Sequence, residues 1–209
     1  MSEWLETEYL RRRERLLRAR AVLLVVDIQE RLVPAMPPEI AAQVIKNSTI
    51  LVGAAARLGC PIIVSQQYPK GLGATVPELS AALAAAESEH GVPVYRFDKV
   101  EFSAAAAPGF ATLPPAEKSG GLLMREQWIV CGMETHVCVY QTVRDLVGPA
   151  CGVHVVADAV SSRTKANWRM GLDLARDVGA LVTSTETVVF DLLGQAGTDE
   201  FKTLSKMIK

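Results

Sequence analysis

A cysteine, an aspartate and a lysine in this sequence each follow an apolar run that has the pattern of a β-strand. Asp27 ends AVLLVVD, Lys99 ends VPVYRFDK, and Cys138 comes soon after QWIVCG. If these runs are parallel strands of one sheet, their carboxyl ends meet at the edge where ligands bind in such sheets. We therefore expect a shared cleft, in which a carboxylate takes a thiol proton and an ammonium group stabilises the resulting anion.

Cys138 stands in GMETHVCVYQT, where a helical pattern starts a few residues after a glycine. A thiol in the first turn of a helix lies near the positive end of the helix dipole, which lowers its pKa. The free backbone N–H groups of that turn can also receive an oxyanion. Taken alone, such a cysteine is more often buried core, because free cysteine is among the most buried residue types. The hypothesis of a nucleophile therefore depends on its two partners.

Each partner also has an ordinary structural explanation. A strand-end carboxylate such as Asp27 often caps a helix or fixes a loop, and an isolated lysine such as Lys99 is usually solvated. Burying a carboxylate beside so apolar a run is costly unless it is hydrogen-bonded or paired. The combination of the two with Cys138, at three strand ends, favours a reactive site.

The remaining cysteines and the histidines indicate neither a disulfide scaffold nor a zinc site. The chain has 209 residues with four cysteines, no CxxC pair and three scattered histidines. Cys131 lies inside an apolar strand pattern and is predicted to be core, while Cys60 and Cys151 fall at a strand start and a turn. We expect a reduced, cytoplasmic protein that needs no metal and no cofactor.

Net charge and the lengths of the apolar runs argue against two classes of partner, nucleic acids and membranes. The formal net charge is −1, whereas a nucleic-acid-binding protein has a strongly basic face. No apolar run reaches the length of a membrane span. The first residues, MSEWLETEYLRRRERLLRAR, mix basic with acidic residues and are predicted to form a helix rather than a targeting peptide.

Short β-branched runs alternate with longer helical patterns along the chain, which is typical of an α/β fold with a mostly parallel sheet covered by helices on both faces. Strands are predicted at 21–27, 61–65, 92–97, 128–131, 153–157 and 180–183. Helices are predicted at 40–58, 77–87, 135–146, 164–178 and, in two pieces, from 185 onward. No linker or repeat divides them, so we expect a single domain over residues 1–209, with a helical extension at 1–18.

Five motifs, in order and in register, resemble the isochorismatase-like cysteine hydrolase superfamily. They are VVDIQERL, QQYPKGLGATVPEL, KVEFSA, CGMETHVCVYQTVRDL and DAVSSR. The likeness runs from about residue 19 to residue 193. The second and fifth motifs are particularly similar to the branch of isochorismatase-domain-containing proteins.

The resemblance implies a three-layer α/β sandwich of Rossmann-type topology around a six-stranded parallel sheet. It implies that Asp27, Lys99 and Cys138 form a catalytic triad that works through a thioester. It also implies a cis peptide bond between Met133 and Glu134, which aims the backbone N–H groups of Glu134 and Cys138 at a substrate oxyanion. Family members commonly form dimers or larger rings, so we expect a homo-oligomer.

Other residues are candidates for the substrate pocket: Gln29, Tyr68, Phe102, Met133 and His136. Tyr68 is expected on a loop over the pocket, and an ordinary turn is an equal alternative there. His136 can shuttle protons, although a solvated or capping histidine is the more common case. Arg163 is expected to pair with Asp158. Trp168, on a predicted helix, is assigned to the core or to a subunit contact.

The sequence departs from relatives that hydrolyse nicotinamide. Those relatives have an Asp and histidines as a metal site after the second strand, but QQYPKGLGATVPEL contains neither residue type. We therefore predict a metal-independent hydrolase of a small amide or related carbonyl compound. The alternatives are a catalytically silent scaffold or binding protein, and an enol-ether hydrolase that acts without covalent attack.

Overall fold

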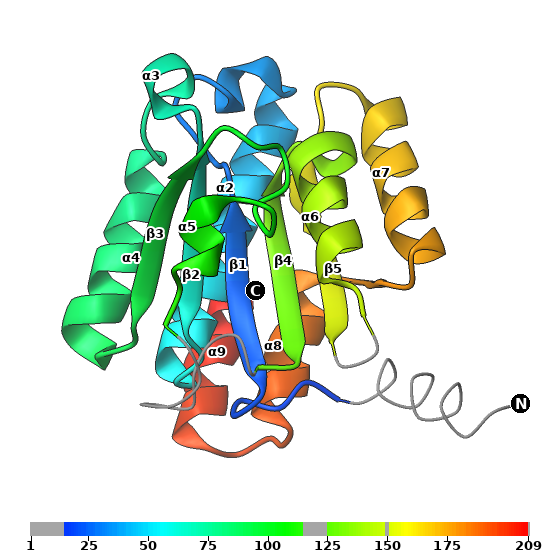
Figure 1. Cartoon of the computed structure of the whole chain (residues 1–209). Coiled ribbons are helices and arrows are strands. Elements are labelled where there is room, and N and C mark those ends of the chain that lie inside the picture. The colour runs from blue at the N-terminus through cyan, green and yellow to red at the C-terminus, as the bar shows by residue number, and fades with distance from the viewer. Residues whose placement is uncertain (1–14, 115–124, 149–150, 209) are drawn as a thin grey trace, which may run out of the picture.

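The computed structural model describes residues 15–114, 125–148 and 151–208 of the chain. Its centre is a six-stranded sheet with the strand order β3-β2-β1-β4-β5-β6, in which every pair of neighbours is parallel (Figure 1). The strands are β1 (Ala21–Val26), β2 (Ile62–Gln67), β3 (Val94–Lys99), β4 (Gln127–Met133), β5 (Gly152–Ser161) and β6 (Leu181–Thr183). The predicted parallel sheet is confirmed.

Helices cover both faces of this sheet, as Figure 1 shows with α2 behind it and α5 and α6 in front. One apolar core contains residues of α2 (Pro38–Arg57), α4 (Pro77–His90), α8 (Thr185–Leu193) and α9 (Asp199–Ile208). The other contains residues of α5 (Pro108–Ala111), α6 (Tyr140–Leu146) and α7 (Lys165–Asp177). The structure also has three short elements: η1 (Val33–Ala35), α3 (Pro69–Leu72) and the π-helical turn η3 (Thr135–Val139). The three-layer sandwich is therefore confirmed.

The central strand β1 explains why its sequence is continuously apolar. Leu23 and Val25 belong to one core, and Val22, Leu24 and Val26 belong to the other. Burying each such side chain contributes about 1.5–3 kcal/mol of transfer free energy. Because both faces are covered, β1 fixes the position of the residue that follows it.

The described N-terminal residues differ from the predicted helix. Residues 1–14 of that helix lie outside the described residues, and residues 15–17 are not helical. Leu16 is buried, and its N–H donates to Oδ2 of Asp191 in α8 at 2.7 Å. This stretch therefore packs against the domain, because the apolar side chain and the backbone N–H both find partners there.

Strand β5 is longer than predicted, at ten residues rather than five. Asp158 interrupts the apolar pattern, which is why the prediction stops at 157. Its Oδ1 accepts hydrogen bonds from the N–H and the hydroxyl of Thr185, at 2.8 and 3.0 Å. The carboxylate is thus satisfied by the start of α8, and β5 continues beside β4, with Val160 opposite Gly132.

Gly132 allows β4 to approach β1 closely at the end of the sheet where Asp27 lies. Its φ is +128°, and a Cβ added there would lie 1.9 Å from the carbonyl oxygen of Val26. No L side chain fits this contact without a shift of one of the two strands. The glycine therefore sets the spacing between the end of β1 and the turn that contains Cys138.

We predict that Gly132→Ala lowers the free energy of unfolding by at least about 3 kcal/mol, because it combines an unfavourable φ with a clash against backbone. Urea denaturation measures this value. Gly148→Ala is the matched control, since among the described residues, its chain neighbours apart, no atom lies within 4 Å of its added Cβ, and it should stay within about 0.5 kcal/mol of the wild type. Equal stability of the two variants would contradict the close approach.

Candidate active site

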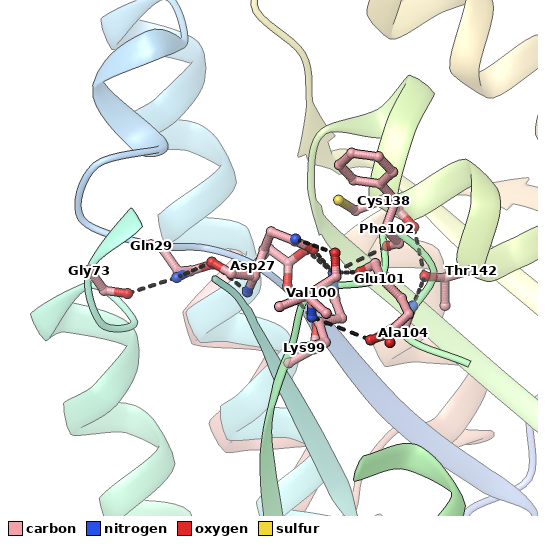
Figure 2. Close-up of polar contacts among 12 residues, drawn as sticks. Asp27, Gln29, Gly73, Lys99, Val100, Glu101, Phe102, Ala104, Cys138 and Thr142 are labelled. Atoms are coloured by element: carbon pink, nitrogen blue, oxygen red, sulfur yellow. Dashed lines mark hydrogen bonds and ion pairs between the residues drawn. The ribbon is translucent and has the colours of Figure 1, made fainter. Parts of the chain in front are cut away.

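Asp27 is the first residue after β1 and is fully buried. Its φ is +52°, and its N–H donates to the carbonyl oxygen of Ser65 at 3.2 Å. Ser65, in β2, also donates its hydroxyl to Oδ1 of Asp27 at 2.8 Å, while Nζ of Lys99 donates to Oδ2 at 2.7 Å (Figure 2). Both carboxylate oxygens therefore have a partner, and one of these partners is a cation.

Lys99 is the last residue of β3, and its side chain is also fully buried. Four oxygens surround its Nζ atom: Asp27 Oδ2 at 2.7 Å, Gln67 Oε1 at 2.6 Å, and the carbonyl oxygens of Phe102 at 3.1 Å and Glu101 at 3.2 Å (Figure 2). An ammonium group has three protons to donate. The protein itself therefore supplies enough acceptors for all of them.

A chain of amide contacts holds this arrangement from β2. Gln67 donates its Nε2 to the carbonyl oxygen of Val100 at 2.9 Å, which orients its Oε1 toward Lys99. Gln29 in turn accepts from the Gln67 N–H at 2.8 Å and donates to the carbonyl oxygens of Gln67 at 3.1 Å and Gly73 at 2.7 Å. Gln29 is fully buried, so its amide ties the loop after β2 to the loop after β1.

Cys138 lies in the π-helical turn η3 that follows β4, and it is buried. The hydroxyl of Thr142, one turn later, donates to the Cys138 carbonyl oxygen at 2.6 Å and accepts from the Ala104 N–H at 2.8 Å. Figure 2 shows the sulfur on the same side of the sheet as Asp27 and Phe102. The loop that follows Lys99 is thus tied to the helix that presents the thiol.

The pKa of the Cys138 thiol is raised to about 12, which makes the expectation of a lowered pKa wrong. Burial is the largest cause, followed by the negative charge of Asp27, and the Lys99 charge offsets only part of the effect. Burial likewise raises the pKa of Cys131 to about 12. Cys138 differs from it in lying near two charged groups, Asp27 and Lys99, that also affect its pKa.

The candidate pocket residues occupy three kinds of position. Tyr68 and Phe102 are about half exposed, at 53% and 55%, and lie on the loops after β2 and β3. Met133 ends β4 and is fully buried. His136 lies in η3, with its Nδ1 atom 3.0 Å from the hydroxyl oxygen of Ser162. Tyr68 and Phe102 therefore offer apolar surface at the strand ends, and His136 is bound to the segment after β5.

The peptide bond between Met133 and Glu134 is cis, as the resemblance implied. The Glu134 side chain is nearly buried, and its Oε2 accepts from the backbone N–H and the Nε of Arg163, at 2.9 and 3.1 Å. The predicted pairing of Arg163 with Asp158 is wrong, because the Asp158 carboxylate is engaged by the start of α8. Arg163 instead links the turn before Cys138 to the segment after β5.

Sequence reasoning missed Ser65 and Gln67, although both contact the Asp27–Lys99 pair directly. Their signal is position, since both are polar residues at the carboxyl end of the strand that lies between β1 and β3. Strand order is what brings them to the pair, and the sequence alone did not supply that order.

The described residues show neither a metal site nor a membrane-spanning helix. No group of three or more His, Cys, Asp and Glu side chains there is arranged to hold a metal ion. None of the helices described combines the length and the apolar character needed to cross a bilayer.

Comparisons with known proteins find relatives over most of this chain. The family model of the isochorismatase domain matches residues 21–187. The secreted isochorismatase effector Isc1 of Phytophthora sojae is 40% identical over 200 residues, which cover 93% of this chain and 87% of that protein. The solved structure of MAR1 ribonuclease from Caenorhabditis elegans is 33% identical with a TM-score of 0.77, and the match covers 93% of this chain and 92% of the other.

A third similar protein is the YcaC gene product of Escherichia coli, described as an octameric hydrolase of unknown specificity. It is 23% identical, with a TM-score of 0.75 over 92% of this chain and 90% of that one. At this identity the likeness shows the fold.

We predict that two substitutions shift the apparent pKa of Cys138 in opposite directions. Asp27→Asn should lower it, because the negative charge and the acceptor that hold the proton are removed, whereas Lys99→Met should raise it, because a stabilising cation is lost. The rate constant of Cys138 alkylation by iodoacetamide at one mildly alkaline pH, followed by peptide mass spectrometry, gives the direction of both shifts, because it rises with the thiolate fraction. In the wild type the rate should climb throughout the alkaline range in which the protein stays folded.

Cys151, which is partly exposed, is the internal reference for these measurements. Its labelling should change little in either variant. Shifts of Cys138 in the same direction in both variants would indicate general loosening of the fold and would contradict the electrostatic explanation.

Proposed function

This chain belongs to the isochorismatase family, and we propose that it is a metal-independent cysteine hydrolase that acts on a small amide or related carbonyl compound. The observation that carries the proposal is the buried ion pair between Lys99 and Asp27, at 2.7 Å, with the Cys138 thiol near enough to both charges for them to shift its pKa. We propose that it needs no metal because QQYPKGLGATVPEL, which starts with the last two residues of β2, has neither Asp nor His.

In the first half of the proposed reaction, the Cys138 sulfur attacks the substrate carbonyl carbon while the thiol proton passes to Asp27. The oxyanion that forms would be stabilised by the backbone N–H groups of Glu134 and Cys138. Collapse of this intermediate breaks the carbon–nitrogen bond. Asp27 returns the proton to the leaving amine, and a thioester on Cys138 remains.

In the second half, water attacks the thioester and gives its proton to Asp27. The carbon–sulfur bond breaks, the sulfur recovers the proton, and a carboxylic acid leaves. Asp27 thus accepts and returns one proton in each half, while Lys99 keeps a constant positive charge beside it. The raised pKa of Cys138 supports this order, since a protonated thiol needs a base at the moment of attack.

Tyr68, Phe102, Met133 and His136 remain the candidate residues that line the substrate pocket. The exposed aromatic side chains of Tyr68 and Phe102 suit a small planar or apolar substrate. We propose that Gln29 supports the pocket rather than lining it, because its side-chain amide holds the loop on which Tyr68 lies.

A second candidate function, hydrolysis of an enol ether without covalent attack, is favoured by two observations. The thiol is protonated at neutral pH, and the similar Phytophthora protein is named an isochorismatase effector. This reaction would start from a protonated Asp27, which gives its proton to the enol-ether carbon. Water would add to the resulting oxocarbenium ion and return a proton to Asp27, and the hemiketal would then break its carbon–oxygen bond with no bond to sulfur. Ribonuclease activity, as in the name of the similar nematode protein, lacks such support here, because a net charge of −1 offers little attraction for a polyanion.

We also propose a homo-oligomer and a cytoplasmic location. Tyr68, Val100 and Phe102 are exposed apolar residues on neighbouring loops, a pattern that suits a subunit contact, and the similar Escherichia coli protein is octameric. Four cysteines without a disulfide suit a reducing compartment. The silent scaffold remains the alternative from another class, and the experiment below distinguishes it.

We predict that a hydrolysis screen over small amides and enol ethers finds turnover that Cys138→Ala lowers by at least about 10³-fold, because the nucleophile is lost. Product formation is measured by chromatography. Amide turnover that survives the substitution would defeat the covalent mechanism, and turnover of enol ethers alone that survives it would favour the second candidate. No turnover of any compound in the screen, by the wild type or by Cys138→Ala, would favour the scaffold.

A further inference from the structure

A second cavity, of about 460 Å³, lies outside the Asp27–Lys99–Cys138 site. Strand β6 pairs only with residues 154–156 of β5, so the second half of β5 has no neighbouring strand on that side. The cavity is formed there, between the start of α2, the second half of β5 and the start of α7. Its lining residues are Pro37, Ile40, Gln43, Val44, Ala157, Asp158, Val160, Ser161, Ser162, Lys165 and Trp168.

The walls of this cavity are mainly apolar and well fixed. Val44 and Val160 are each 1% exposed and belong to the two cores on opposite faces of the sheet. Trp168 donates its Nε1 to the carbonyl oxygen of Ala157 at 3.2 Å, which fixes the indole against β5. A pre-formed apolar cavity of this volume, with a few polar groups, is typical of a site for a small molecule.

Of the two charged side chains that line the cavity, Asp158 has hydrogen-bond partners, whereas Lys165 makes no ion pair within the described residues. The Asp158 carboxylate accepts from the N–H and the hydroxyl of Thr185 at the start of α8, so the dipole of that helix offsets its charge. Lys165 is exposed, makes no ion pair within the described residues, and is the first residue of α7, whose first turn has no acidic side chain. A cation at the start of a helix is unfavourable, so helix stability does not account for Lys165.

The segment that forms one wall of the cavity also holds the turn before Cys138. Ser162 lines the cavity and contacts His136 Nδ1 at 3.0 Å, and Arg163 binds Glu134. Further along, α7 contacts the turn through Gly171, where an added Cβ would lie 2.6 Å from the backbone carbon of Thr135. A molecule that restrains this segment therefore also restrains the turn that carries the thiol.

We propose that this cavity is an effector site for a small carboxylic acid with an aromatic or alicyclic body, and that its occupation lowers the reactivity of Cys138. The apolar body contacts Ile40 and Trp168 above the buried Val44 and Val160, and the carboxylate pairs with Lys165. The buried thiol reacts only when its turn opens, and a ligand that binds the closed form reduces the open population. This inference goes beyond the proposed function and does not require turnover, since thiol alkylation reports it.

Benzoate is the probe, and benzyl alcohol is the uncharged probe of similar shape. Benzoate should bind saturably, as followed by ligand-observed NMR, and should slow alkylation of Cys138 by iodoacetamide about tenfold at nine times its dissociation constant. Both effects should have the same midpoint. Benzyl alcohol should bind at least about threefold more weakly, because it forms no ion pair with Lys165.

Three variants locate the effect. Gln43→Trp places a large side chain at the cavity from an exposed helix position and should abolish both binding and the slowing of alkylation. Lys165→Met should weaken benzoate binding to the level of benzyl alcohol. Lys46→Met, which removes an exposed charge from the same helix α2 outside the lining, should change neither effect.

Four results would overturn the proposal. One is the absence of benzoate binding at millimolar concentration, and another is binding that leaves the alkylation rate unchanged. Slowing that persists in Gln43→Trp would place benzoate in the cleft of Cys138 instead. Self-association of the protein that excludes benzoate and is lost in Gln43→Trp would show that the cavity receives a second copy of the chain.

Discussion

The ion pair between Lys99 and Asp27 is the interaction on which the site depends, because both side chains are withdrawn from water. Removing one member of such a pair leaves an uncompensated buried charge and costs about 3–5 kcal/mol. The pair joins the ends of β1 and β3, which are not neighbours, and β2 between them supplies Ser65 and Gln67 to complete the hydrogen bonds. The order of the strands is thus a requirement of this buried pair as well as of the core.

Burial also raises the pKa of the Cys138 thiol. Desolvation and the charge of Asp27 together outweigh Lys99, so the Cys138 thiol keeps its proton. The mechanism that we propose therefore starts from a thiol and needs Asp27 to take its proton at the moment of attack. Contacts from Arg163, Ser162 and Thr142 fix the turn and helix that hold this thiol.

Particular residues show how far the sequence determines the architecture. The apolar run that ends at Asp27 and the alternation of strands and helices were enough for the parallel sheet. The end of β5 was missed because the partner that satisfies Asp158 is Thr185, which is 27 residues away. For the same reason Arg163 was assigned to Asp158 rather than to Glu134. Periodicity reports which side chains are buried, whereas polar pairing depends on strand order and on contacts between distant segments.

The sign of the Cys138 pKa shift was also beyond the sequence. Position near a helix start predicted a lowered pKa, but the burial that raises it follows from two cores closing over the sheet. Neutron diffraction at neutral pH tests the central claim most directly, because it locates protons. We predict a deuterium on the Cys138 sulfur directed at Asp27, none on the Asp27 carboxylate, and three on Nζ of Lys99. A bare sulfur beside a protonated Asp27 would contradict the account.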